Sequence, residues 1–159
     1  MRMTNGYRSK PPIVHALRTP ALLALLLAGC FSGCSRTNPA ERDMDVGLRL
    51  MNSSFELTDE LRESLVEELG LPTEIRERDA IIRFFMVRSA EAGEEYRGAY
   101  YFLGLHLLAI DCEQGKAYIG KYLDHREDED AQEVLRTATE QGCEAAVEVA
   151  RKQWSGSDG

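Results

Sequence analysis

The sequence has no surplus of basic residues. Its 159 residues include 19 Lys and Arg against 27 Asp and Glu, a formal net charge of −8. Residues 1–29 contain four basic and no acidic side chains, so residues 30–159 hold 15 basic and 27 acidic side chains, a net charge of −12. A protein that neutralises nucleic-acid phosphates needs a basic face. The net negative charge therefore argues against nucleic-acid binding and favours a cationic partner.

Recognisable catalytic and cofactor-binding motifs are also missing. The chain contains no nucleophile elbow, phosphate-binding loop, zinc-binding helix or glycine-rich dinucleotide turn. His106 lies in an apolar stretch without a His or carboxylate three or four residues further on, which is typical of a hydrogen-bonded core or boundary residue. We therefore expect no catalytic residue, no metal and no cofactor. The alternative is an envelope hydrolase that uses carboxylates or His106 in a cleft.

No apolar run near the N-terminus is long enough to cross a bilayer. The run at residues 21–28 (ALLALLLA) has eight residues, whereas a spanning helix needs roughly 17 to 25. It follows a basic segment and Pro20 and ends in small residues, which is the layout of a secretory signal. We expect residues 1–29 to be a signal peptide.

The end of this segment resembles the lipobox of bacterial lipoproteins, in the residues Leu27, Ala28, Gly29 and Cys30. The resemblance implies cleavage between Gly29 and Cys30, a thioether from Cys30 to diacylglycerol and acylation of the new amine. Cys34 is the alternative lipidation site, although Phe31 stands where an aliphatic residue is usual.

The resemblance also implies a location. Each buried methylene of an acyl chain contributes about 0.8 kcal/mol, so two or more chains hold a protein firmly at a membrane. Phe31 follows Cys30 where an Asp is associated with inner-membrane retention. We expect an anchor in the outer membrane, facing the periplasm, with residues 30–37 as a flexible tether.

Periodicity predicts that residues 38–154 form an all-α domain and residues 155–159 a disordered tail. Apolar residues recur at three and four positions, and no two-residue alternation persists beyond four residues. The expected helices cover residues 38–52, 58–70, 72–93, 94–110, 112–123, 128–141 and 143–154. Short turns between them predict about seven antiparallel helices, as a tetratricopeptide-like solenoid or a small helical bundle. Gly98 and Gly104 suggest close approach by a neighbouring helix.

Two fragments resemble the Sel-like subclass of tetratricopeptide repeats, residues 99–104 (AYYFLG) and 138–145 (ATEQGCEA). The resemblance implies close packing of the first helix of a pair and an end of the second helix at Gln141 and Gly142. The interval from Gly104 to Gly142 is longer than the family has, so a non-repeat bundle remains the alternative. The resemblance implies a protein-binding surface.

Cys112 and Cys143 begin two helices that run parallel in an up-down array, so both lie at one end of it. A disulfide between them would stabilise by on the order of 3 to 4 kcal/mol in the chain-entropy model. The alternative is two separately buried thiols.

Four tyrosines are candidates for a binding groove: Tyr96, Tyr100, Tyr118 and Tyr122. Tyrosine supplies rigid contact area with a polar tip, so the group suits a protein or a small ligand, with core packing as the alternative.

Taken together, the sequence predicts a lipid-anchored envelope protein whose helical domain binds another protein. It would act as an adaptor, an assembly factor or an inhibitor of a basic partner. The alternatives are a small-ligand-binding lipoprotein and the hydrolase.

Overall fold

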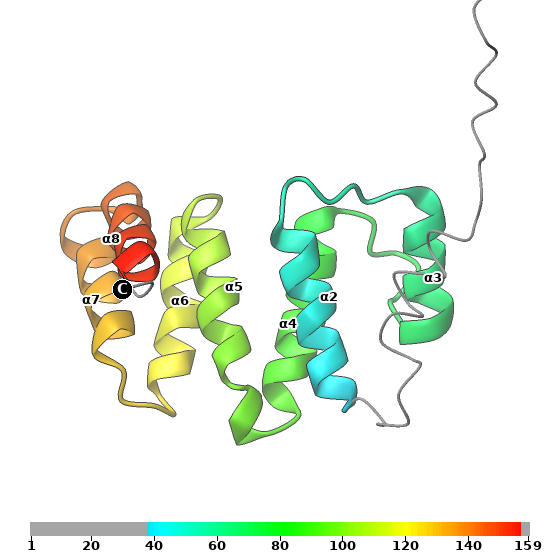
Figure 1. Cartoon of the computed structure of the whole chain (residues 1–159), viewed down its shortest axis with the longest axis horizontal. Coiled ribbons are helices and arrows are strands. Elements are labelled where there is room, and N and C mark those ends of the chain that lie inside the picture. Colours follow the sequence, from blue (N-terminus) through cyan, green and yellow to red (C-terminus); the bar gives the residue numbers. More distant parts are fainter. Residues whose placement is uncertain (1–37, 157–159) are drawn as a thin grey trace, which may run out of the picture. The chain divides into compact units, whose positions relative to one another are not determined.

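The computed structural model describes residues 38–156, and the predicted signal peptide, the tether, Cys30 and Cys34 lie outside the described residues. In the described part the chain is all-helical and has no strand, which confirms the predicted fold class (Figure 1). Its elements are α2 (Pro39–Met51), α3 (Asp59–Leu69), α4 (Arg78–Glu91), the 3-10 turn η1 (Glu94–Tyr96), α5 (Gly98–Leu108), α6 (Cys112–Leu123), α7 (Glu129–Glu140) and α8 (Cys143–Gly156). No helix in residues 38–156 combines the length and hydropathy needed to cross a membrane.

Most helix ends lie where local sequence signals place them. Four helices begin with a side-chain oxygen that accepts a backbone N–H of the first turn, because those N–H groups have no partner within the helix. The capping residues are Asn38, Thr58, Asp111 and Asp128. Gly70 (φ 68°) ends α3 and Gly142 (φ 97°) separates α7 from α8, both in the left-handed region that favours glycine.

Helix α4 begins six residues later than the sequence predicts. Pro72 does not open a helix but a turn, in which Ile75 N–H donates to the Pro72 carbonyl over 3.1 Å. The start at Arg78 is determined by tertiary contacts, since its guanidinium donates to the carbonyls of Leu50 (2.7 Å) and Asn52 (2.6 Å) at the end of α2. The bond pair ties the first turn of α4 to the last turn of α2.

The predicted helix over residues 94–110 is divided. Residues 94–96 form η1, and α5 begins only at Gly98. Tyr96 therefore does not continue the helical stripe of Tyr100. At the other end of the domain, α8 continues to Gly156, so it includes the first two residues of the predicted tail.

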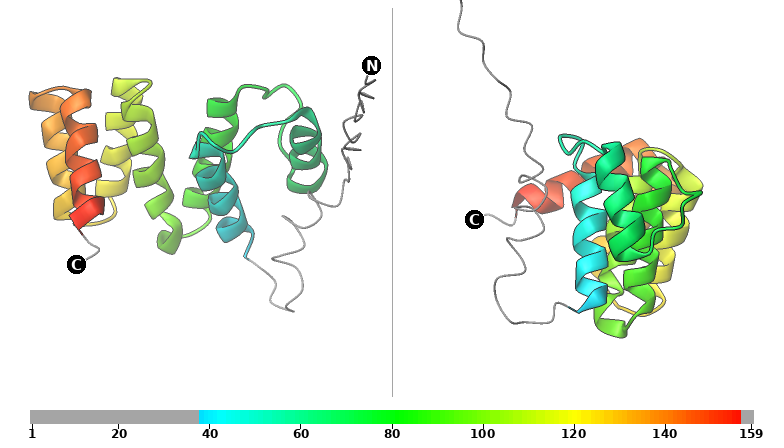
Figure 2. Two further views of the ribbon diagram at one scale, coloured as in Figure 1. Left: turned by 45° about the horizontal axis from the view of Figure 1, so that its top comes forward. Right: turned by 90° about the vertical axis from the view of Figure 1, so that its right-hand side faces the viewer.

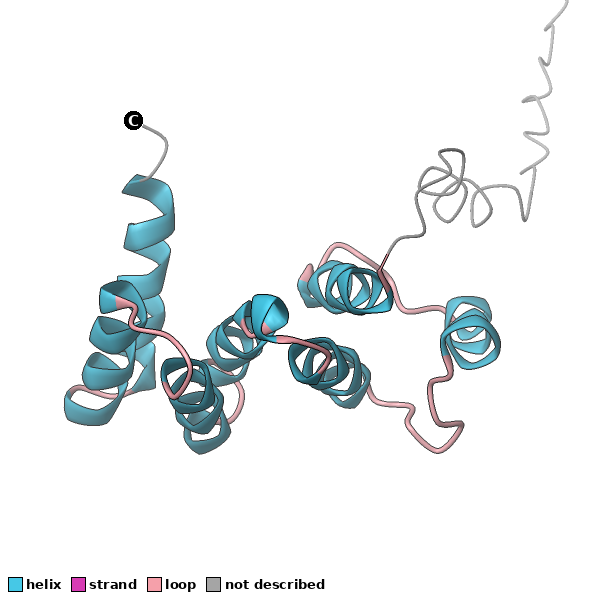
Figure 3. Ribbon diagram, turned by 90° about the horizontal axis from the view of Figure 1, so that it is seen from below, coloured by secondary structure: helices cyan, strands magenta, loops and turns pink. Residues whose placement is uncertain are grey.

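Helices α5 and α6, and α7 and α8, pack as antiparallel hairpins, and α2 packs against α4, from which α3 separates it in the chain (Figures 1 and 2). Helix α5 is central, because it contacts α2, α4, α6 and α8. Figure 3 shows most helices nearly end-on, with α8 and α2 on either side of α5. The core is one cluster that includes Phe85, Leu103, Ile119 and Val134.

Two glycines allow α5 and α6 to touch at their backbones. A Cβ on Gly104 would lie 3.0 Å from the Ile119 nitrogen, and one on Gly115 would lie 2.6 Å from the Leu108 nitrogen. The predicted close approach is therefore found at Gly104. It is not found at Gly98, where a Cβ would meet open space and where α5 begins.

An ion pair between a buried carboxylate and a partly exposed guanidinium holds the N-terminal helices together. Asp43 on α2 is only 3% exposed, and its carboxylate accepts two hydrogen bonds from Arg88 on α4, 2.5 and 2.6 Å long. The remaining Arg88 nitrogen donates to the Leu69 carbonyl at the end of α3 over 2.8 Å. One guanidinium thus links three helices, and its hydrogen bonds offset part of the cost of burying the charge.

Candidate functional site

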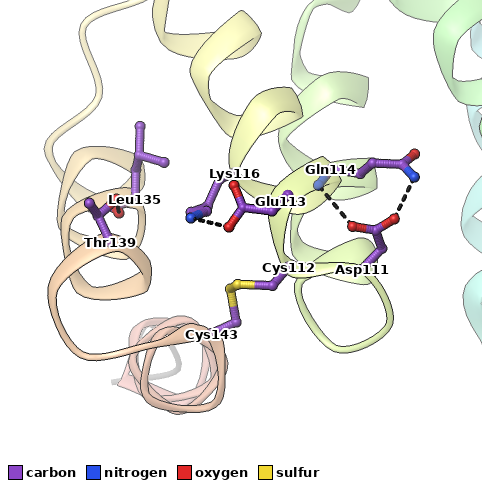
Figure 4. The surroundings of a disulfide bond; sticks show 8 residues. All are labelled: Asp111, Cys112, Glu113, Gln114, Lys116, Leu135, Thr139 and Cys143. Carbon is purple, nitrogen blue, oxygen red and sulfur yellow. Dashed lines mark hydrogen bonds and ion pairs between the residues drawn. A yellow bond between two sulfur atoms is a disulfide. The ribbon is translucent and has the colours of Figure 1, made fainter.

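The two cysteines of the described domain form a disulfide, as the sequence suggested. The sulfur atoms of Cys112 and Cys143 lie 1.99 Å apart and their Cα atoms 5.8 Å apart (Figure 4). The bond joins the first residue of α6 to the first residue of α8, next to the cap of α6 that Asp111 provides. It therefore holds the start of α8 against the centre of the domain.

The four candidate tyrosines differ in their burial and in their partners. Tyr100 and Tyr122 are 4% and 5% exposed, so both belong to the core. Tyr100 stacks on Tyr118 with ring centroids 5.9 Å apart. Tyr96 lies on η1, and its hydroxyl oxygen accepts a hydrogen bond of 2.8 Å from the Asn38 amide. Tyr100 and Tyr122 thus follow the alternative of core packing, whereas Tyr96 and Tyr118 remain partly exposed.

Burial and neighbouring carboxylates raise the pKa of the hydroxyls of Tyr101 and Tyr122. Burial, followed by Asp128 and Asp130, raises the pKa of Tyr101 to about 12. Burial also raises the pKa of Tyr122, whose hydroxyl donates to Asp128 over 2.6 Å. That hydrogen bond lowers the pKa of Asp128. These groups keep one protonation state near neutral pH, which suits a structural role.

An open groove lies elsewhere, between α2, α5 and α8. It has a volume of about 540 Å³, within the range of ligand and peptide sites. Its lining is mostly apolar: Leu48, Met51 and Asn52 from α2 and its C-cap, Phe102, Leu105 and His106 from α5, and Val147, Ala150, Arg151 and Trp154 from α8. None of the four candidate tyrosines lines it.

Large apolar side chains are exposed to solvent in this groove. Leu48 is 37% exposed and Trp154 is 55% exposed. They are two of the three large hydrophobic residues that are exposed among residues 38–156, the third being Ile110 in the turn between α5 and α6. The Trp154 ring lies 6.0 Å from the Phe102 ring, so the wall from α8 meets the floor from α5. Exposed apolar residues that gather in a concavity indicate a binding surface.

Each helix contributes a regular stripe to the groove. On α5 the lining residues are spaced at i, i+3 and i+4, and helical geometry places them opposite Tyr100 and Gly104. None of these α5 residues except His106 is a candidate site residue from the sequence alone. One signal in the sequence points to the stripe, because α5 is apolar on all sides and a helix in so small a domain has too few neighbours to cover every side.

The polar groups of the groove do not form a catalytic arrangement. His106 Nε2 lies 3.1 Å from the Asp79 carboxylate, and Arg151 pairs with Glu148. The lining contains no carboxylate, serine, cysteine or tyrosine. His106 thus has the Asp79 carboxylate within hydrogen-bond distance. Among residues 38–156, no three His, Cys, Asp or Glu side chains come together as metal ligands do.

Fold and groove define a class: an all-helical domain with an open apolar surface between three helices. No protein-family model matches the chain, and no curated protein or solved structure matches it either.

Proposed function

We propose that this is a lipid-anchored envelope protein whose helical domain binds another protein through the groove between α2, α5 and α8. The observation that carries the proposal is the exposure of Leu48 and Trp154 in one concave, mostly apolar surface. Fully burying a side chain of this size is worth about 1.5–3 kcal/mol, so leaving both open costs free energy that a partner recovers. Tryptophan is also among the residues that most often dominate protein interfaces.

The anchor part of the proposal rests on the lipobox-like residues that end at Cys30 and on the disulfide between Cys112 and Cys143. Disulfides persist in oxidising compartments such as the periplasm, and rarely in the cytosol. Acyl chains on Cys30 would keep the domain at the membrane, and the polar tether would let it reach a partner. Such a protein serves as an adaptor, an assembly factor or an inhibitor.

Lipidation is tested by growing cells on a clickable palmitate analogue and comparing three forms of the full chain. The wild type and Cys34→Ser are expected to carry the label and to have lost residues 1–29, whereas Cys30→Ser remains unlabelled and unprocessed. Label on Cys30→Ser but not on Cys34→Ser would move the site to Cys34. A wild-type protein without label would overturn the proposed anchor.

Partner binding is tested by photo-crosslinking in intact cells. A benzophenone amino acid replaces Leu48 in the groove or, as the control, Ile110, which is also a large apolar residue, is more exposed (55% against 37%) and lies outside the groove. We expect a discrete protein adduct from position 48 that is absent from position 110. The same adducts from both positions, or none from position 48, would overturn binding through the groove.

A further inference from the structure

The walls of the groove present almost no polar groups that an extended peptide could use. The floor (α5) and both walls (α2 and α8) are helices, and most of their backbone groups already bond within the helix. Of the polar side chains, the Asn52 oxygen accepts from Ser54, His106 pairs with Asp79, and Arg151 pairs with Glu148. An extended peptide pressed against this surface would lose the water that solvates its N–H and C=O groups and gain few partners in return.

Binding by addition of a β-strand is also excluded, because residues 38–156 contain no sheet edge that a strand could extend. An α-helix avoids the cost, since it satisfies its own backbone groups and presents only side chains. The residues that line the groove also recur at helical spacing along α2, α5 and α8. The lining of α8 runs from Val147 to Trp154, which is about two helical turns, or roughly 10 Å. An occupant with apolar anchors at i, i+3 or i+4, and i+7 fits such a stripe.

The domain that carries the groove has a negative net charge. Residues 38–156 hold 26 Asp and Glu against 14 Lys and Arg. Exposed acids lie on both helices that form the walls: Asp45 on α2, which pairs with Arg49, and Glu144 and Glu148 on α8. Arg151, the one Lys or Arg in the lining, is paired with Glu148. A cationic occupant is therefore attracted to the domain that carries the groove, whereas an anionic one is repelled.

From these observations we infer that the groove receives one face of a basic amphipathic α-helix from the partner protein. Its apolar stripe contacts Leu48, Phe102 and Trp154, and Lys or Arg side chains on its flanks face the acids of α2 and α8. The inference rests on the proposed function and specifies what kind of segment the partner supplies.

The test uses the acylated full protein in nanodiscs of zwitterionic lipid, with empty nanodiscs as the reference. The probes are three 18-residue peptides that lack Trp and have equal leucine content. The first carries Leu at helical spacing with Lys elsewhere, the second has the same composition with Leu and Lys alternating, and the third has Glu in place of Lys. Trp154 is the single tryptophan of the chain, so the blue shift of its emission reports occupation of the groove.

We expect the helical Lys peptide to shift the emission of Trp154 and to bind at least about tenfold more tightly than either other peptide. Leu48→Glu should weaken that binding by at least about tenfold, although it adds a negative charge that attracts the peptide. Ile110→Glu, which adds the same charge outside the groove, should leave the affinity within about twofold.

Three results would overturn the inference. Tighter binding of the alternating peptide would show that the occupant is extended, and tighter binding of the Glu peptide would show that the charge has the opposite sign. Equal binding to wild type and Leu48→Glu would place the peptide on the acidic surface instead of in the groove. If any of these occurs while the crosslink from position 48 still captures a partner, the proposed function stands and only the helical, basic occupant fails.

Discussion

Helix α5 has apolar side chains all round, but its two sides differ in what covers them. On one side Tyr100, Leu103 and Gly104 are buried, and at Gly104 the backbone of α6 comes into contact. On the other side Phe102 and Leu105 form the floor of a groove that stays open. Similar side chains therefore have a structural role on one side and are available for binding on the other.

The difference shows that apolar character alone does not identify a binding surface. The tyrosines are the more suggestive group in the sequence, yet their side of α5 is closed because two glycines let α6 approach. The groove side stays open because α2 and α8 stand on either side of α5 and no helix of residues 38–156 lies over it. Function is thus expected on the side where neighbours are missing.

The largest contrast is expected between two leucines of α5. Leu103→Ala removes a side chain that is fully buried and should lower the free energy of unfolding by about 2–5 kcal/mol. Leu105→Ala, on the groove side, should cost about 1 kcal/mol or less, because its side chain is only half-buried. Urea denaturation followed by circular dichroism measures both, and equal losses would contradict the contrast.

The disulfide links the two sides, since it joins α6, which covers the closed side, to α8, which forms a wall of the open one. Replacing Cys112 and Cys143 with Ala should lower the free energy of unfolding by about 3–4 kcal/mol, because 31 residues separate the two cysteines. Reductant should have the same effect on the wild type and none on the double variant. A change below about 1 kcal/mol would show that packing alone holds α8.

Alanine substitutions at two glycines of α6 test whether the close backbone contact between α5 and α6 covers the side of α5 that carries Tyr100. Gly115→Ala forces a methyl group against the backbone of Leu108 and should destabilise by about 1–3 kcal/mol. Gly120→Ala is the matched control on the same helix, where a methyl group meets nothing within 4 Å, and it should stabilise by up to about 1 kcal/mol. Thermal unfolding of both variants checks the opposite signs, and two changes of the same sign would refute them.

The smallest effect is expected at the hydrogen bond from Tyr122 to Asp128. This bond lowers the pKa of Asp128 in the folded protein, so its contribution is present above the ordinary pKa of Asp and is lost as the pH falls through the lowered value. Tyr122→Phe should cost about 1 kcal/mol at pH 7, and the difference from wild type should shrink in acid. Urea denaturation of the wild type and of Tyr122→Phe, at pH 7 and in acid, measures the difference, with Tyr118→Phe as the control. A difference independent of pH would contradict the assignment.

Much of the local structure could be predicted because its causes are local. Asn38, Thr58, Asp111 and Asp128 cap the helices that follow them, and Gly70 and Gly142 end helices. Each acts on backbone groups within a few residues of itself. The start of α4 could not be predicted, because it depends on bonds from Arg78 to Leu50 and Asn52, more than twenty residues away.

The site was predicted less well than the fold. The pair Cys112 and Cys143 was identified, since helix direction alone brings both to one end of the array. The tyrosines are candidates for a groove because their residue type suits binding, with core packing as the alternative, and the structure buries two of them. Leu48 and Trp154 were not singled out as a site, since each looks like one more core position on an amphipathic helix.

By itself the sequence determined the all-α class, most helix ends and the acidic surface, because periodicity, capping and charge act through neighbours along the chain. The tertiary structure decided which side of α5 is covered and which is open. That choice depends on contacts between helices that are distant in sequence, above all the glycine contact of α5 with α6 and the positions of α2 and α8 beside the groove. Burial is a property of the whole packing, and no single segment encodes it.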